Sequence, residues 1–557
     1  MARLDRLGPA KEVAQIGAAI GLEFSHALLS AVAQKPEAQL NSAIEALLAA
    51  GLVFRQGTPP EVIYLFKHVL VQDAAHGTLL REPRRALHAR IAATLETQFT
   101  DIVERQPEVM ARHCTEAGLI ERAAHLWGKA GQRSLSRSAL IEAVEQLSRA
   151  LAHIAALPSN VELRREQIGL QVALINPLMH VKGYAAPETK EAAEQARRLI
   201  EQAESNGEPP DEPLLLFSIL YGFWVAHYVA FDGDVICDLA AQVLTLAEER
   251  QATLPLVTGH RLMGASYLHI GEIIKARTHL DKAMDLYQPA EHRRGATLFG
   301  QDVRVAALFY RSLALWQLGY PDAAIRDAAR SGVDARDTGQ AATVMAALAI
   351  TSLTHIHCGN YGLAKEQLDE VCALADEKSA MFWKVGGMLL LGCVSALNGK
   401  AADAVQTIGS GLQAWRSTGA SLWMPVYLAH LIGAHADLGR FDDAWRCFNE
   451  ATTLMQQTKE RWCESEIYRI AGEVAIRSPD SDVSKAEAFF RHALEVAKAQ
   501  QAKSYELRAA TSLARLRLDQ GRRDEALQQL SPIYNWYSEG FHTHDLRQAK
   551  ALLDMLA

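Results

Sequence analysis

The chain has 557 residues, more than a single hydrophobic core normally serves, so two or more domains or a linear array of repeats is expected. Its net charge of −8 lacks the basic excess that nucleic-acid-binding domains usually carry. No apolar run reaches the roughly 18 residues needed to cross a bilayer, and the N-terminal residues lack the apolar core of a signal peptide. We therefore expect a cytoplasmic protein that contacts neither nucleic acid nor membrane.

Residues 1–100 are predicted to form a small domain of their own. A turn with the sequence QGTPPE, which contains Pro59 and Pro60, separates two β-prone runs of this domain. Three helices followed by a β-hairpin is the order of elements in a winged-helix domain. The predicted elements are helices Pro9–Ile20, Ser25–Ala33 and Glu37–Ala50, strands beginning at Leu52 and Val62, and helices Lys67–Leu80 and Pro83–Phe99.

A winged helix can bind DNA through its third helix if that helix carries cationic side chains. The segment in question, AQLNSAIEALLAAG from Ala38, contains no Lys or Arg and carries Glu45. Phosphate contacts supply much of the affinity for DNA and require cations. We expect no nucleic-acid partner, and a transcriptional regulator is kept only as an alternative.

From residue 107 onward the chain is predicted to be helical and repetitive. Glycines return at the ends of helices, at first in steps of forty residues, and each is followed five residues later by an alanine. A fixed period of this length is typical of stacked-repeat architectures. The glycines are Gly319, Gly359, Gly399, Gly439 and Gly521, and the alanines are Ala324, Ala364, Ala404, Ala444 and Ala526.

Residues near each alanine follow a local rule. Ala276 is followed by Leu280 and Ala283, and this spacing of four and then three places all three on one helical face. A small residue also recurs twelve positions before the alanine, where it allows the two helices of a hairpin to approach closely. These small residues are Gly131, Gly264, Ser312, Ser352, Gly392 and Ala514.

This pattern resembles the tetratricopeptide repeat, as in LWQLGYPDAAIRDA from Leu315. The forty-residue period exceeds the usual one of about 34, which implies longer helices or longer connections. The predicted fold is all-α: a tetratricopeptide-like α-solenoid of about ten helical hairpins over residues 107–557, preceded by the winged-helix domain.

The segment YLFKHVLVQDAAHGTLL, from Tyr64 to Leu80, resembles the winged-helix part of bacterial signal-transduction ATPases with numerous domains (STAND proteins). The family includes members fused to class III adenylate/guanylate cyclase domains. The resemblance continues through the segments that begin at Pro107 and Gly183 and through the C-terminal NWYSEGFHTHDLRQAKALLDMLA. It therefore spans nearly the whole chain.

The nucleotide-binding part of such proteins is missing from this sequence. No G-x-x-x-x-G-K-[ST] motif is present to cradle phosphates, and no G-x-S-x-G or H-E-x-x-H motif occurs. We expect no enzymatic activity and no catalytic residue in this chain. The alternative is that the chain is the C-terminal fragment of an adenylate/guanylate cyclase with an ATPase domain, its start assigned late.

Two residues are candidates for ligand contacts. By resemblance to related switch ATPases, His68 would help to read a bound nucleotide, but only if an ATPase domain is present; otherwise it is a histidine satisfied at its own domain's packing surface. Trp383 lies on a predicted first helix, where it either joins the core or lines the concave face as a ligand anchor.

We expect neither a metal site nor a cofactor. Residues two apart on a helix point away from each other, so His355 and His357 cannot chelate one ion from one face. A second cluster, His542, His544 and Asp545, is an H-x-H-D motif, which by itself is too common to indicate a metal site. The seven cysteines are scattered and contain no C-x-x-C pair, which favours free thiols over disulfides or zinc.

The sequence therefore predicts a non-catalytic signalling sensor or scaffold. We expect it to bind a protein segment, a peptide or a small-molecule effector on the concave face of its repeats. By the family resemblance, occupancy would be transmitted through the winged helix to an ATPase or cyclase module supplied in trans.

Overall fold

The structure is a computed structural model that describes residues 7–58, 61–184, 186–208, 214–293 and 295–557. Within these residues it is α-helical apart from one three-stranded sheet. The chain divides into two compact units. Unit 1 comprises residues up to Arg137 together with Glu142–Leu170, and unit 2 comprises Ser138–Ile141 and Gln171–Ala557. The predicted domain limits, 1–100 and 107–557, stay a prediction.

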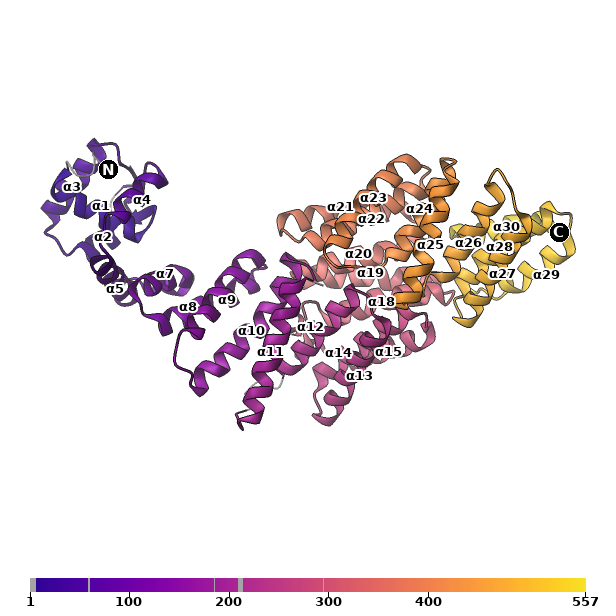
Figure 1. Ribbon diagram of the computed structural model, residues 1–557, viewed down its shortest axis with the longest axis horizontal. Coiled ribbons are helices and arrows are strands. Elements are labelled where there is room, and N and C mark those ends of the chain that lie inside the picture. Colours follow the sequence, from indigo (N-terminus) through magenta and orange to yellow (C-terminus); the bar gives the residue numbers. More distant parts are fainter. Residues whose placement is uncertain (1–6, 59–60, 185, 209–213, 294) are drawn as a thin grey trace. The chain divides into compact units, whose positions relative to one another are not determined.

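Unit 1 begins with a small mixed fold, at the indigo end of the ribbon in Figure 1. The helices lie within two or three residues of their predicted positions. Pro59 and Pro60 of the predicted turn fall outside the described residues. The elements are α1 (Pro9–Ile20), β1 (Glu23–Ser25), α2 (His26–Ala33), α3 (Glu37–Ala49), β2 (Val53–Gln56), β3 (Ile63–Phe66), α4 (Val69–Gly77) and α5 (Arg81–Gln98).

The sheet has the order β1-β3-β2 with both pairings antiparallel. Strand β1 was not predicted, because three residues are too few to show an alternating pattern. It pairs Phe24 with Tyr64 on β3, while Val53 on β2 pairs with Phe66. These buried side chains join the sheet to the apolar faces of the first three helices, where Ile16 and Leu29 are buried.

Helices continue through the rest of unit 1. Gly131 on α8 lies so close to α9 that a Cβ atom there would stand 2.6 Å from the Leu147 side chain. The first helical hairpins of the chain are therefore packed as the small-residue pattern predicted. The helices are α6 (Thr100–Arg105), α7 (Pro107–Ala117), α8 (Ile120–Ser136), α9 (Leu140–Ala155) and the start of α10 (Val161–Val181).

Unit 2 is a run of helical hairpins that can be followed in chain order from magenta to yellow (Figure 1). In each pair a first helix is followed, after a short turn, by an antiparallel second helix. The pairs are α12 (Leu214–Val229) and α13 (Gly233–Glu249), α14 (Thr253–Ile270) and α15 (Ile273–Leu286), α18 (Val303–Gln317) and α19 (Pro321–Asp337), α20 (Ala341–His357) and α21 (Tyr361–Glu377), α22 (Met381–Leu397) and α23 (Ala401–Ser417), α24 (Met424–Asp437) and α25 (Phe441–Thr458), α26 (Glu464–Arg477) and α27 (Val483–Ala499), and α28 (Lys503–Asp519) and α29 (Arg523–Asn535).

Four further helices flank or interrupt these pairs in unit 2. Helix α11 precedes the first pair, two single-turn helices lie between the second and third pairs, and α30 follows the last pair. These helices are α11 (Pro187–Ser205), α16 (Pro289–His292), α17 (Gly295–Leu298) and α30 (His544–Leu556).

The two helices of a pair pack closely because small residues meet large ones at matched positions. A Cβ atom at Gly264 would stand 2.6 Å from Leu280, and one at Gly392 would stand 2.6 Å from Ile408. Both partners lie four residues after the repeat alanine, as the sequence pattern predicted. The alanines that open the second helices are fully buried: Ala276, Ala324, Ala364, Ala404, Ala444, Ala486 and Ala526.

The repeated glycines end the first helices. Gly319 has a φ of 89° and its N–H bonds to Trp316 O, while the next N–H, of Tyr320, returns to Leu315 O. A left-handed residue after the helix end allows both bonds, and glycine adopts that conformation without strain. Gly359 repeats this geometry with a φ of 82°. The periodic glycines are therefore the turns between first and second helices.

Successive turns of the superhelix in unit 2 are joined by hydrogen bonds. Ser421 N, before α24, donates to Val229 O at the end of α12, at 2.9 Å. Arg461 N, before α26, donates to His269 O at the end of α14, also at 2.9 Å, and Ser504 Oγ on α28 donates to Trp316 O on α18 at 2.5 Å. The first helices run in the order α12, α14, α18, α20, α22, α24, α26, α28, α30. Each contact therefore spans five positions in that order.

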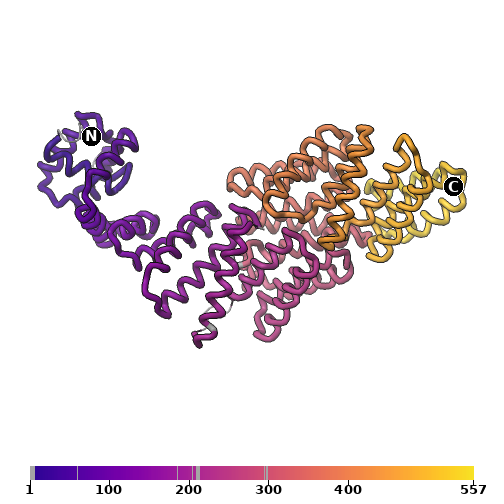
Figure 2. Tube along the Cα trace, viewed as in Figure 1, coloured from indigo at the N-terminus to yellow at the C-terminus, as the bar shows by residue number. Residues whose placement is uncertain are grey.

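The all-α, tetratricopeptide-like solenoid predicted from the sequence is confirmed by these helix pairs, whose course Figure 2 traces as a tube. The inner face differs from an open concave groove, because successive turns touch each other. Among the described residues, no helix combines the length and apolarity that crossing a bilayer requires.

Candidate functional site

His68 is the N-cap residue of α4, in unit 1, and is exposed. Its Nδ1 accepts a hydrogen bond from Leu70 N at 3.2 Å. A side chain in this position satisfies one of the free N–H groups at a helix start, which is a structural role. The proposed reading of nucleotide phosphates by His68 stays a prediction.

Trp383 lies on α22 and is 5% exposed. Its ring packs edge-on against Tyr184 and Phe382, with centroids 6.4 Å and 5.2 Å away. Its Nε1 is buried and has no hydrogen-bond partner among the described residues. Trp383 is therefore part of the interior, with one donor left unused, and its role as a ligand anchor stays a prediction.

The clusters considered for metal binding are separated by the fold. The His357 ring stacks on Trp316, with centroids 4.2 Å apart and planes 13° from parallel. His542 lies near Asp322, whereas Asp545 pairs with Arg508. Within the part of the chain that the structure describes, no three His, Cys, Asp or Glu side chains are grouped to hold a metal ion.

A charged cavity of about 270 Å³ lies on the inner face of unit 2. Six first helices line it, namely α20, α22, α24, α26, α28 and α30. Its apolar wall includes Val426, Ala429 and Ile470. Its polar groups include His357, His430, Glu466, Arg469, Glu473, Tyr505, Arg508, Ser512, Arg515, His544 and Asp545.

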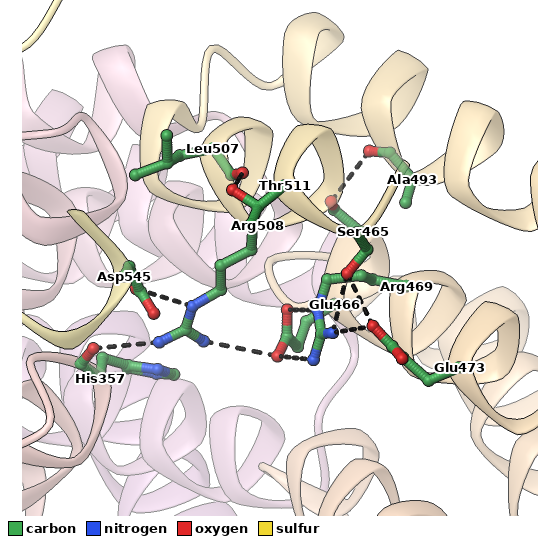
Figure 3. Close-up of polar contacts among 11 residues, drawn as sticks. His357, Ser465, Glu466, Arg469, Glu473, Ala493, Leu507, Arg508, Thr511 and Asp545 are labelled. Carbon is green, nitrogen blue, oxygen red and sulfur yellow. Dashed lines mark hydrogen bonds and ion pairs between the residues drawn. The ribbon is translucent and has the colours of Figure 1, made fainter. Parts of the chain in front are cut away.

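Arg508 is the central contact of this charged cavity (Figure 3). Its Nε donates to Asp545 Oδ2 at 2.8 Å, and a terminal nitrogen donates to the carbonyl oxygen of His357 at 3.0 Å. The other terminal nitrogen lies 3.4 Å from Glu466 Oε1. One guanidinium thus joins α28 to α26, α30 and the end of α20, and its planar fork of donors makes this multiple pairing feasible.

Glu466 belongs to a second layer of the same network. Arg469 donates to both of its carboxylate oxygens, each at 2.9 Å, and also reaches Glu473 at 3.3 Å. Burial alone would raise the pKa of Glu466, but Arg469 and Arg508 outweigh it and hold the pKa at about 2. Glu466 is therefore ionised at neutral pH.

Two buried histidines of the cavity, His357 and His430, carry no charge at neutral pH. Burial lowers the pKa of His430 to about 4, and burial together with Arg508 lowers the pKa of His357 well below its ordinary value. The arginine and carboxylate side chains of the lining number three each, so their formal charges balance.

Three groups of the cavity are left without partners among the described residues. The buried Nε2 of His357 and the buried hydroxyl of Tyr505 make no hydrogen bond. Arg515, which lines the same cavity, is exposed and has no ion pair or hydrogen bond to any residue described. Unused donors in a cavity are positions where a ligand can bind.

Sequence reasoning missed this cavity. Asp545 was predicted only as a member of a rejected metal cluster, and Glu466, Arg469 and Arg508 were not among the predicted site residues. A signal was present, because Glu466 and Arg469 lie three residues apart and so share one face of a first helix. Which inner faces meet across the superhelix cannot be read from that spacing.

No family model matches the chain. An uncharacterized protein of Rhizobium meliloti (strain 1021) is 27% identical over 545 residues, which cover 93% of this chain and 50% of that protein. The chain therefore spans about half the length of this curated relative.

Several solved structures are similar to the chain. A Rap protein complexed with competence and sporulation factor gives a TM-score of 0.43 at 13% identity, covering 73% of this chain and 99% of that one. The Rap conjugation gene regulator of plasmid pLS20, in complex with the Phr* peptide, gives 0.40 at 10% identity, covering 70% and 95%. A STAND protein with a tetratricopeptide repeat sensor from Pyrococcus horikoshii gives 0.30 at 11% identity, covering 98% and 64%. The fold assignment rests on the helix pairs of this chain rather than on these similarities.

Proposed function

We propose that this chain is a non-catalytic binding protein whose charged cavity holds a peptide or a segment of a partner protein. The observation that carries the proposal is the set of unused donors on the cavity wall, above all Arg515. An extended peptide offers backbone carbonyls to groups such as Tyr505 and His357, and an acidic side chain or terminus to Arg515. The apolar wall at Val426 and Ile470 accepts a small apolar side chain.

The test is a binding selection from a synthetic peptide library, followed by affinity measurement on the peptides selected. We expect those peptides to carry an acidic group that pairs with Arg515. Arg515→Ala then weakens binding about fivefold, since an exposed ion pair contributes up to about 1 kcal/mol, and Arg515→Glu weakens it further.

The matched control is Arg326→Ala on second helix α19. Arg326 is likewise exposed and without a partner among the described residues, but it does not line the cavity. Its substitution should leave peptide affinity unchanged. Equal loss in the Arg515 and Arg326 variants, or a library that yields no peptide bound by the wild-type chain, would contradict the proposal.

We further propose that occupancy of the solenoid is transmitted through the N-terminal fold to a STAND-type ATPase or cyclase module supplied in trans. Two observations support this. The element order α1-β1-α2-α3-β2-β3 agrees with the winged helix expected from the sequence, and the segment Tyr64–Leu80 resembles the STAND winged-helix part. Helix α3 contains no Lys or Arg, which disfavours a transcriptional regulator.

An alternative is that the chain is the C-terminal fragment of an adenylate/guanylate cyclase with an ATPase domain. The curated relative, of which this chain spans about half, supports only the greater length that this alternative requires. The DNA upstream of the codon for Met1 distinguishes the two proposals. An in-frame G-x-x-x-x-G-K-[ST] motif there would support the longer enzyme, whereas a stop codon close to Met1 would support a module acting in trans.

A further inference from the structure

A second, smaller cavity lies on the inner face of unit 2, among aromatic rings. Its volume is about 40 Å³. Residues of first helices α12, α14, α18, α20 and α22 line it, together with residues of the segments between helices, among them Tyr184, which follows α10. The lining includes Tyr184, Tyr221, Trp224, Arg261, Tyr310 and Trp383.

Arg261 is the charged group of this aromatic cavity, and it is 1% exposed. Its guanidinium carbon lies over the rings of Tyr221 and Trp224, at 5.2 Å and 5.5 Å from their centroids. Its Nε and Nη2 have no hydrogen-bond partner, and no carboxylate of the described residues pairs with it. Arginines buried to this degree normally have an anionic partner.

The tyrosines around Arg261 do not supply that anion. Burial raises the pKa of Tyr310 to about 12, although Arg261 acts in the opposite direction. Burial also raises the pKa of Tyr221 and Tyr184, against the nearby Arg261 guanidinium and Trp383 indole respectively. Arg261 Nε, Arg261 Nη2 and Trp383 Nε1 make no hydrogen bond to these hydroxyls or to any other group among the described residues. The phenols are therefore neutral at neutral pH.

Glu460, a buried carboxyl group of the same unit, is engaged elsewhere. Glu460 accepts hydrogen bonds from Trp423 N and Trp462 Nε1, each at 3.0 Å. Burial raises its pKa to about 8 despite these bonds, so it is largely protonated at neutral pH. The charge of Arg261 thus stays uncompensated within the described residues, and two cation–π contacts recover only part of the cost of burying it.

Trp383 contributes a third unused donor to the same cavity, because its buried Nε1 also has no partner among the described residues. Arg261 Nε, Arg261 Nη2 and Trp383 Nε1 are N–H donors that cannot act as acceptors. A wall that offers buried donors and one uncompensated positive charge is complementary to an anion with two acceptor oxygens.

We propose that this aromatic cavity binds a carboxylate group, held by Arg261 and Trp383. A water molecule needs at least about 10–15 Å³, so about 40 Å³ accommodates a carboxylate with a very short chain but no ring. The carboxylate comes from a free small acid or from the C-terminus of a peptide. This site is separate from the charged cavity, and its test does not depend on Arg515.

The experiment measures binding of formate, acetate, propionate and benzoate to the full chain by calorimetry and by thermal unfolding at constant ionic strength, with chloride as reference. We expect acetate to bind and to raise the melting temperature of the wild-type chain, and benzoate not to bind. Peptides with free and amidated C-termini form a second arm. Binding of the free form alone assigns the carboxylate to a peptide, and binding of acetate without either peptide assigns it to a small acid.

Two variants make the test specific. Arg261→Met removes the charge at similar volume and should abolish the acetate response, while circular dichroism checks that the chain remains folded. Trp383→Phe keeps the ring and removes one donor, and should weaken acetate binding several-fold; this variant suffices if Arg261→Met does not fold. The proposal is overturned if chloride matches acetate with the wild-type chain, if neither acetate nor the free C-terminal peptide binds it, or if the variants respond as the wild type does.

Discussion

Substitution of Arg508 by Met is expected to loosen the C-terminal end of the solenoid. The Arg508 side chain is 18% exposed and that of Asp545 is 16% exposed. Met removes the contacts at 2.8 Å to Asp545 and at 3.0 Å to His357 O, while Arg469 still neutralises Glu466. Two hydrogen bonds of a charged group, at about 1.5 kcal/mol each, give a loss of ~3 kcal/mol.

This value lies at the lower end of the range of about 3–5 kcal/mol for breaking a buried ion pair, as expected for groups that water partly screens. About half of the loss comes from leaving the Asp545 carboxylate without its partner. The double variant Arg508→Met/Asp545→Leu should therefore recover about half of it, because no uncompensated charge remains.

Amide hydrogen exchange is the appropriate assay, since a chain with two compact units need not unfold in one step. Protection should fall in α28 and α30 and stay constant in α14 and α15. A loss of less than about 1 kcal/mol in the single variant, or a double variant no more stable than the single one, would refute the reasoning.

Three further predictions concern stability. Burial holds the pKa of Glu460 at about 8, above its ordinary value of 4.5. The stability that its protonated form contributes is therefore complete below pH 4.5 and is lost as the pH rises through 8. Glu460→Gln should raise the urea midpoint relative to wild type at pH 9 but not at pH 5. Burial lowers the pKa of His269 and of His430 to about 4, below the ordinary histidine value of 6.5. The stability that their neutral forms contribute is therefore present above pH 6.5 and is lost as the pH falls through 4. The urea midpoint of the wild type should fall from pH 7 to pH 4, and that of His430→Gln should fall less steeply. Gly392→Ala should destabilise the chain by about 1–3 kcal/mol, because the new Cβ would stand 2.6 Å from a side chain of α23. Gly409 lies on the exposed side of α23 with open space around it, so Gly409→Ala should stabilise the chain by ~0.5–1 kcal/mol in the same urea titration.

The packing within helix pairs could be predicted from the sequence because it depends on local spacing. Gly392 and Ile408 are sixteen residues apart, and one turn and one helical period are enough to bring them together. The turn glycines follow from the same local rule, since only the ends of first helices require a left-handed residue. In the N-terminal fold, β1 was missed because its three residues are specified by pairing with β3 and not by their own pattern.

The contacts between successive turns of the superhelix could not be predicted in this way. The rotation from one helix pair to the next is small, and its sum over four or five pairs decides which residues meet. Arg508 and His357 are 151 residues apart, and no local pattern relates them. Arg261 did leave a signal, because it is the only Lys, Arg, Asp or Glu within α14 and lies three residues before Gly264. That spacing places it on a buried face, but the absence of a partner appears only in three dimensions.

Contacts between turns also determine how the ligand proposed for the charged cavity would act on the solenoid. Arg508 both lines the charged cavity and holds α30 against the end of α20, so a ligand there shares its contacts with the elements that join one turn to the next. A ligand shifts a conformational equilibrium only by as much as its affinities for the two states differ. A ligand that pairs with Arg515 and leaves the contacts of Arg508 intact favours the conformation in which the turns are held together. A ligand that competes with Arg508 for Asp545 favours their separation. The sign of the response to a ligand therefore depends on which of these two arginines it engages.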